Sequence, residues 1–213
     1  TTDALRWLEN CNEVETDKQA LRASTFNFKA LYDSLKPDLV KEALRHSMNT
    51  TRPNWSPAFC NWLVDLVDIS LRSSIGCFEN QWYVQKNGVP TGGSLCVQLA
   101  NITVFYVMNK CVYGNENMMK RVRSVKRYID DGAGFFYSTE RKFTQWIEKV
   151  NKSLERFGLL IDEYQWKDVG TFVAFLDIEF CFDAEGNLQT DLHVKETDSR
   201  NYLHFSSEHP NNI

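Results

Sequence analysis

The stretch that decides the fold is "VKRYIDDGAGFFY", residues 125–137, in which two adjacent carboxylates, Asp130 and Asp131, separate two runs rich in aromatic and β-branched residues. Such runs around a short polar segment predict two antiparallel strands joined in a hairpin. One interpretation of Asp-Asp-Gly is ordinary turn chemistry, because Asp and Gly tolerate turn geometry. The other is a functional site, and it requires partner residues elsewhere in the chain.

The composition predicts one globular domain over residues 1–213. Hydrophobic residues make up 43% of the chain and charged residues 24%, which is neither a disordered nor a membrane composition. No apolar run approaches the roughly 20 residues that span a bilayer, and "TTDALRWLENC" lacks the order of a signal peptide. We therefore expect no membrane partner, and the scattered cysteines indicate an intracellular location, in the nucleus or cytoplasm. The missing initiator Met suggests a processed or excised fragment.

The cysteines and the net charge limit which kinds of site and ligand are expected. None of the six cysteines forms a Cys-x-x-Cys pair, which argues against a zinc site and predicts reduced thiols: Cys11, Cys60, Cys77, Cys96, Cys111 and Cys181. The net charge of −4 weighs against nucleic-acid binding, because phosphate contacts come from Lys and Arg. Local basic clusters, or basic parts outside this chain, would offset it.

In the first half of the chain, hydrophobic periodicity predicts a strand followed by helices. A short strand begins at residue 24, and Pro37 opens a helix that runs through residue 48. A second helix is expected at 56–74, with one core-facing side: Phe59, Leu63, Leu66 and Val67. Residues 77–88 read as two short strands, and a Gly-rich turn then leads into an apolar helix with Ser94 as N-cap.

The second half predicts one strongly amphipathic helix and one hairpin. Residues 138–158 place apolar side chains at helical spacing and end at Gly158, where a C-terminal cap belongs. Residues 176–194 alternate on both sides of an "AEGN" turn, which predicts an antiparallel pair. The fold class is therefore α+β, a mostly antiparallel sheet with helices packed on one face.

Several blocks in order resemble reverse transcriptases. These are "FNFKALY", the Gly-rich "QKNGVPTGGSLCVQLAN", the hairpin "YIDD", and "ERFGLLIDEYQWK", a block that in similar polymerases often ends in a functional Lys. The tail, with "FLDIEF" and "LHVKETDSRNYLHFSSEHP", most resembles Penelope-like reverse transcriptases, relatives of telomerase. The resemblance covers about residues 24–210.

The resemblance implies a right-hand polymerase palm with partial fingers. Residues 24–37 and 91–213 would form the palm and its closing hairpin. Residues 1–23 and about 38–90 would belong to the fingers, with the thumb and most of the fingers absent. The implied activity is RNA-directed DNA polymerisation with an RNA template, a DNA primer and dNTPs. A partner chain or missing segments would supply the rest of the fingers and the thumb. Without them we expect weak, salt-dependent binding of the primer–template.

The implied chemistry uses two Mg²⁺ ions, with Mn²⁺ as a possible substitute, held by Asp130, Asp131 and the first block. In that block the family has a metal-bridging Asp where this chain has Asn27, followed by Phe28. An amide offers an oxygen but no charge, so we expect severely reduced catalysis. Asp33 is an alternative carboxylate, although its spacing does not place it at the same site.

Two origins of Asn27 are open: an engineered change that stops turnover, or a natural change in a retired polymerase kept for binding. The corresponding functions are an impaired polymerase palm and an inactive nucleic-acid-binding or assembly protein. An unrelated α+β binding module, with Asp-Asp-Gly as a mere turn, is a third interpretation, and the agreement of several blocks in order disfavours it.

The resemblance also implies roles for other residues. The nucleotide-binding set would comprise Phe28, Tyr32, Thr91, Gly92, Gly93 and Gln98. Tyr32 would exclude a ribose 2′-hydroxyl and so select dNTPs; alternatively it is an aromatic side chain of the core. The two glycines would let the backbone approach the nucleotide; alternatively they only allow the helix to start. Lys167 is a candidate general acid or a solvated surface Lys. Nucleic-acid contacts would come from the basic run "KRVRSVKR", the following Tyr and the tail, through Arg123, Lys126, Arg127, Tyr128 and Lys195. The alternative for the basic run is a solvated face.

Overall fold

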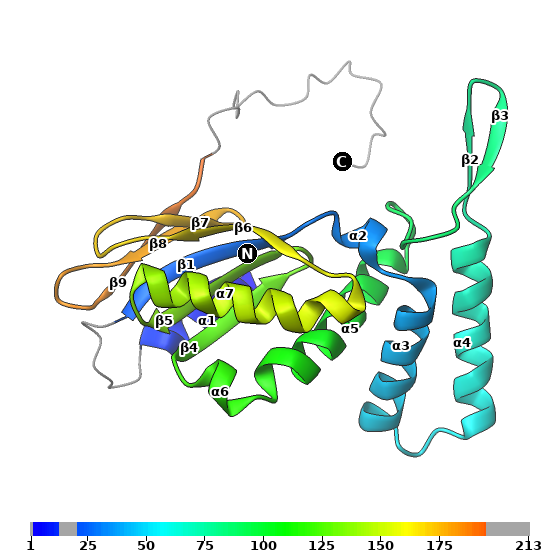
Figure 1. The fold of residues 1–213 in the computed structure, drawn as a ribbon, viewed down its shortest axis with the longest axis horizontal. Helices are drawn as coiled ribbons and strands as arrows, with labels where there is room; N and C mark the ends of the chain where they lie inside the picture. The colour runs from blue at the N-terminus through cyan, green and yellow to red at the C-terminus, as the bar shows by residue number, and fades with distance from the viewer. Residues whose placement is uncertain (1, 13–20, 195–213) are drawn as a thin grey trace.

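A four-stranded antiparallel sheet forms the centre of the computed structural model, which describes residues 2–12 and 21–194 (Figure 1). The strand order is β4-β5-β1-β6, and the strands are β1 (Leu21–Phe28), β4 (Val122–Tyr128), β5 (Asp131–Tyr137) and β6 (Ile161–Trp166). The predicted hairpin is confirmed as β4–β5, and β1 lies between β5 and β6. The first block of the sequence is thereby placed beside the Asp-Asp hairpin.

One face of this sheet is covered by helices. These elements are α5 (Cys96–Met108) with a π-helical turn (Asn109–Tyr113), α6 (Glu116–Met119), and α7 (Glu140–Leu154) with a 3₁₀ turn (Glu155–Phe157). Side chains alternate across β1, so that Phe26 and Phe28 enter the core beneath these helices, where Phe136 of β5 joins them. The predicted cap is confirmed, because Gly158 ends this segment with φ +75°.

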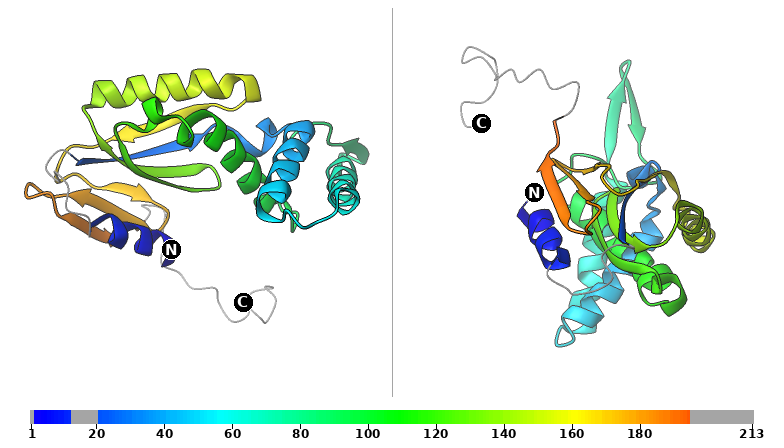
Figure 2. Two further views of the ribbon diagram at one scale, coloured as in Figure 1. Left: turned by 90° about the horizontal axis from the view of Figure 1, so that it is seen from below. Right: turned by 90° about the vertical axis from the view of Figure 1, so that its left-hand side faces the viewer.

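The opposite face is covered by α1 (Thr2–Asn12) and a three-stranded sheet (Figure 2). The strands of this sheet are β7 (Val173–Phe175), β8 (Ile178–Phe182) and β9 (Leu188–Leu192), of which β8–β9 is the predicted second hairpin. Leu21, Ala23 and Phe135 face this layer, and the Trp7 ring stacks on Phe135 with centroids 4.8 Å apart. The architecture is α+β, as predicted. One face of the central sheet is covered entirely by helices, and the other face is covered by one helix together with a second sheet.

A helical extension lies to one side of the sheet. It comprises α2 (Leu31–Ser34), α3 (Pro37–Thr51), α4 (Pro57–Arg72) and the ribbon β2–β3 (Ile75–Phe78 and Gln81–Val84). Helix α3 packs between α5 and α4, and the ribbon projects beyond the end of α4 (Figure 1). From α3 to β3 this extension corresponds to the segment expected to form part of the fingers, whereas α2 falls in the segment expected to be palm; both assignments stay predictions.

Two local predictions are wrong, the first of them in part. In α4, Leu63 and Val67 pack against the core as expected. Phe59 and Leu66 do not, since they are 40% and 44% exposed, and the most buried side chains are Cys60, Val64 and Leu71. The reason is that α3 is the main packing partner of α4, so only a narrow stripe of α4 is covered. The predicted N-cap of α5 is also wrong: the helix begins at Cys96, and its N-cap residue makes no side-chain hydrogen bond.

Candidate functional site

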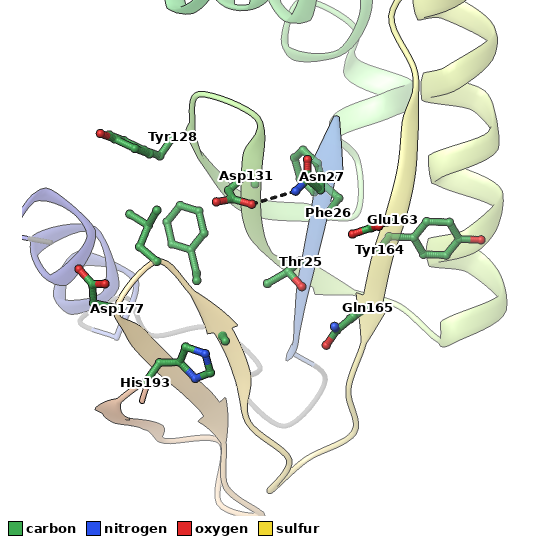
Figure 3. Close-up of a pocket in the computed structure, with 14 residues that line it drawn as sticks. Thr25, Phe26, Asn27, Tyr128, Asp131, Glu163, Tyr164, Gln165, Asp177 and His193 are labelled. Carbon is green, nitrogen blue, oxygen red and sulfur yellow. Dashed lines mark hydrogen bonds between the residues drawn. The ribbon is translucent and has the colours of Figure 1, made fainter. Parts of the chain in front are cut away.

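Three polar side chains form a row across the central sheet at one end of β1. In the register of β1 and β5, Asn27 lies opposite Asp131, and on its other side Asn27 lies opposite Glu163 of β6. The Asn27 amide Nδ2 donates a hydrogen bond to Asp131 Oδ1 over 3.2 Å (Figure 3). Two carboxylates thus flank an uncharged amide on one face of the sheet.

The hairpin turn is made by Ile129 and Asp130, because Tyr128 pairs with Asp131. Asp131 and the following Gly132 are therefore strand residues, and the interpretation of Asp-Asp-Gly as the turn is wrong. Ile129 has φ +54°, a left-handed conformation that is strained for a β-branched residue. The backbone N–H of Phe28 donates to the Asp130 carbonyl over 3.1 Å, which ties the turn to β1.

The Arg127 guanidinium connects the same turn to helix α5 by hydrogen bonds. It donates to the carbonyl of Ile129, and to the side-chain and backbone oxygens of Asn101 on α5 over 3.1 and 3.2 Å. Burial lowers the pKa of Arg127, and the charge of Asp130 partly opposes that shift. These contacts make Arg127 a support of the turn, so this guanidinium is not available for phosphates as expected.

Only a glycine fits at position 132, because the Phe26 ring leaves no room for a side chain. A Cβ at this position would lie 2.2 Å from the Phe26 ring, and no real Cβ makes such a contact. The aromatic ring of β1 therefore fits directly over the β5 backbone beside Asp131. This close approach explains why a glycine follows the two carboxylates, a reason that turn chemistry alone does not supply.

A cleft of about 620 Å³ opens over the polar row, between the central sheet and the β7–β8 turn (Figure 3). Its polar lining residues are Thr25, Asn27, Asp131, Glu163, Gln165, Asp177 and His193. The His193 ring Nδ1 lies 3.4 Å from Glu179 of β8. Sequence reasoning did not single out Glu163 or Asp177. No local pattern marks either residue, and strand pairing is what brings Glu163 beside Asn27.

The row does not fit a two-ion centre as it stands. Within the described residues, no group of three or more His, Cys, Asp or Glu side chains converges on a point that could hold a metal ion. Asp131 receives the Asn27 amide, whereas the charge of Asp130 acts on Tyr32 and Arg127. Mg²⁺ is bound by several oxygen atoms that converge on it, whereas here the N–H group of the Asn27 amide points at Asp131, where a metal-binding oxygen would be needed.

Tyr32 lies near the hairpin turn and the start of α5, close enough for the charges of Asp130 and Cys96 to act on it. Burial raises the pKa of Tyr32, and the nearby Asp130 charge raises it further. The Tyr32 carbonyl accepts from the Val89 N–H over 2.8 Å, so it contacts the segment that leads into the Gly-rich turn. A Cβ on Gly88, which has φ +80°, would meet that carbonyl at 2.8 Å. Tyr32, Asp130 and the start of α5 are thus neighbours.

The remaining expected nucleotide contacts differ in accessibility. Thr91, Gly92, Gly93 and Gln98 are exposed. Phe28 is buried in the core and offers only its backbone to the site. Their roles in nucleotide binding stay predictions.

Lys167 lies away from the polar row. Its backbone N–H donates to the Ala23 carbonyl over 3.3 Å, four residues along β1 from Asn27, or about 13 Å at strand spacing. The structure therefore does not bring Lys167 to the expected site of chemistry. Arg123 and Lys126 are half-buried on β4, and Tyr128 is exposed at the rim of the cleft. Lys195 lies outside the described residues.

Two further observations concern thiols and membranes. All five cysteines whose side chains are described are free: Cys60, Cys77, Cys96, Cys111 and Cys181. Every helix in the described part of the chain is too short or too polar to span a bilayer.

Comparison with known proteins finds this fold in solved telomerase structures. No family model and no curated protein matches the sequence. Solved telomerase structures do match. Apo telomerase from Candida tropicalis has a TM-score of 0.65 at 12% identity, over 90% of this chain and 36% of that chain. Telomerase from Candida albicans, in complex with a fragment of telomeric RNA, has a TM-score of 0.62 at 13% identity, over 89% and 34%.

The matches show a reverse-transcriptase-like, palm-type polymerase fold. The chain spans about a third of the length of the telomerase chains it matches. At these identities the likeness concerns the fold alone, so the more specific resemblance to Penelope-like enzymes stays a prediction.

Proposed function

We propose that this chain is the palm of an RNA-directed DNA polymerase of Penelope-like type whose nucleotidyl-transfer centre is silenced at position 27. The observation that carries the proposal is the row Asp131–Asn27–Glu163 at the open end of a palm-type sheet, beside a strained and well-supported turn. Strain concentrates where function demands a fixed geometry. An otherwise intact site with one missing charge fits descent from a working enzyme.

The missing charge matters because nucleotidyl transfer develops negative charge on the attacking and leaving oxygens. Divalent ions supply the compensating charge in such polymerases, and carboxylates hold those ions. The Asn27 amide instead donates to Asp131, and the donor set does not fit two ions. We therefore assign binding of RNA template, DNA primer and dNTPs to the present chain, with at most weak transfer.

Primer extension on an RNA template tests the proposal. The assay compares this chain, Asn27→Asp, and Asn27→Asp with Asp131→Asn added, in Mg²⁺ and in Mn²⁺. We expect extension from Asn27→Asp alone, because only that variant has carboxylates at both facing positions. Equal extension by all three proteins would indicate a contaminating polymerase and would refute the assignment of the site.

A binding-only protein is the second candidate. The Asn27–Asp131 hydrogen bond favours it, because the amide donor satisfies one oxygen of the half-buried carboxylate without any cation. If Asn27→Asp folds and binds primer–template but never extends it, the binding-only function becomes the better account.

A further inference from the structure

A second cavity, of about 450 Å³, lies at the far end of the β4–β5 hairpin from the Asp130 turn. It is formed by α6 and the segment that joins it to β4, by the end of β5, and by the side of α7 that faces α6. Four cationic side chains line it: Lys120, Arg121, Lys142 and Lys149. No carboxylate is among its lining residues.

These four positive charges are not neutralised by the described part of the chain. None of them lies within ion-pair distance of a carboxylate in residues 2–12 and 21–194. Glu140 and Glu148 of α7 face a neighbouring surface instead, together with Arg141. Four like charges around one cavity, in a chain whose net charge is −4, create a local positive potential that attracts anions.

The cavity is held in place by core contacts. Its floor includes Phe136, Phe143 and Trp146, whose side chains are at most 9% exposed. The Trp146 indole Nε1 donates to the Met118 carbonyl over 2.9 Å, which ties α7 to α6. The backbone N–H of Tyr137 donates to the Arg121 carbonyl over 2.9 Å. Both cationic walls therefore keep their spacing without a ligand.

The spacing of the charges selects an extended anion. Lys142 and Lys149 are seven residues apart on one side of α7, or about 10 Å along the helix axis, which is longer than one phosphate group. Lys120 and Arg121 form the opposing wall. Polar side chains of Asn117, Ser138 and Gln145 also line the cavity and offer additional hydrogen bonds.

We propose that this cavity binds the phosphodiester backbone of a nucleic-acid strand, at a site separate from the polar cleft. The seven residues of β5 separate the two sites by about 20 Å. Binding here does not depend on position 27, so the inference stands whether or not the chain transfers nucleotides. It also identifies which positive charges of this acidic chain are free for phosphates.

Fluorescence anisotropy with a labelled single-stranded RNA oligonucleotide tests the proposal on the whole chain. The cavity variant is Lys142→Gln with Lys149→Gln. The matched control is Arg141→Gln with Lys152→Gln, which removes the same charge from exposed positions of the same helix outside the cavity. We expect the cavity variant to bind about tenfold more weakly at about 100 mM salt. The slope of log K against log salt should fall by about 1.4, for two neutralised contacts.

Three results would overturn the proposal. Equal losses in the two double variants would indicate a general charge effect, and unchanged binding in the cavity variant would indicate that the cavity is not used. Competition by a nucleoside triphosphate that depends on Lys142 and Lys149, with RNA binding unaffected by the same substitutions, would assign the cavity to a free nucleotide. Thermal melting of both variants verifies that the fold is retained.

Discussion

Asn27 and Asp131 lie opposite one another on β1 and β5, and the Asn27 amide donates a hydrogen bond of 3.2 Å to the Asp131 carboxylate. With an Asp at position 27, three carboxylates would follow one another across β5, β1 and β6, because Glu163 lies on the other side. Like charges opposite each other on neighbouring strands are destabilising. Position 27 therefore determines both the charge of the site and the stability of the sheet around it.

Asn27→Asp should make the thermal stability of the protein depend on divalent ions. In EDTA we expect its Tm to fall by a few degrees, from a loss of about 1 kcal/mol. Added Mg²⁺ should raise the Tm of this variant and leave that of the parent chain nearly unchanged. Thr25→Asp is the control, since Thr25 shares the cleft but lies opposite Ala133 and Gln165. The same Mg²⁺ response in both variants would contradict a site centred on position 27.

Arg127→Met should destabilise the protein by about 3 kcal/mol, because it leaves the Ile129 and Asn101 oxygens without their charged donor. Urea unfolding measures this loss. Lys126→Met, at the adjacent position on β4, should change the unfolding free energy by less than about 0.5 kcal/mol. Similar values for both variants would mean that the guanidinium contacts do not support the turn.

Gly132→Ala should be among the most damaging small substitutions, with a loss of about 3 kcal/mol, because the new methyl group would overlap the Phe26 ring at 2.2 Å. Gly76→Ala is the matched control in the β2–β3 ribbon, where a Cβ meets nothing within 4 Å. Chemical denaturation compares the two variants. If Gly132→Ala unfolds like the parent chain, the close approach of β1 and β5 is not as described.

The α3–α4 contact should weaken in acid. Lys41 Nζ lies 2.8 Å from Asp38 and 3.0 Å from Asp68, and hydrogen bonding by Lys41 lowers the pKa of Asp68. A lowered pKa in the folded state stabilises the fold above the ordinary Asp value, and that stabilisation is lost as pH falls through the folded-state pKa. The window therefore lies below about pH 4.

Lys41→Met tests this dependence by urea unfolding between neutral and acidic pH. The variant should be less stable than the parent chain at neutral pH, and the difference should shrink as the pH falls below about 4. Lys29→Met is the control, because Lys29 and Asp162 form an exposed pair 3.8 Å apart. A difference for Lys41→Met that stays constant down to acidic pH would show that the ion pairs do not contribute.

The sequence by itself determined the elements with strong local patterns. The aromatic and β-branched runs on either side of Asp130 and Asp131 predict β4–β5, helical spacing with a terminal Gly158 predicts α7, and the alternation around "AEGN" predicts β8–β9. The ordered blocks also indicated a reverse-transcriptase palm. Each of the three element signals lies within a few turns or one hairpin, where neighbouring residues decide the conformation, whereas the blocks indicate the palm through their order along the chain.

Only the tertiary structure decided how distant segments meet. Strand register placed Glu163 beside Asn27, and it put the turn at Ile129–Asp130 instead of at Asp-Asp-Gly, residues 130–132. Helix packing left Phe59 exposed and brought residues 120–121 and 142–149 around one basic cavity. Register and packing depend on contacts between residues far apart in the chain, and a change of register by one residue reverses which side chains share a face. Local periodicity carries no information about those contacts.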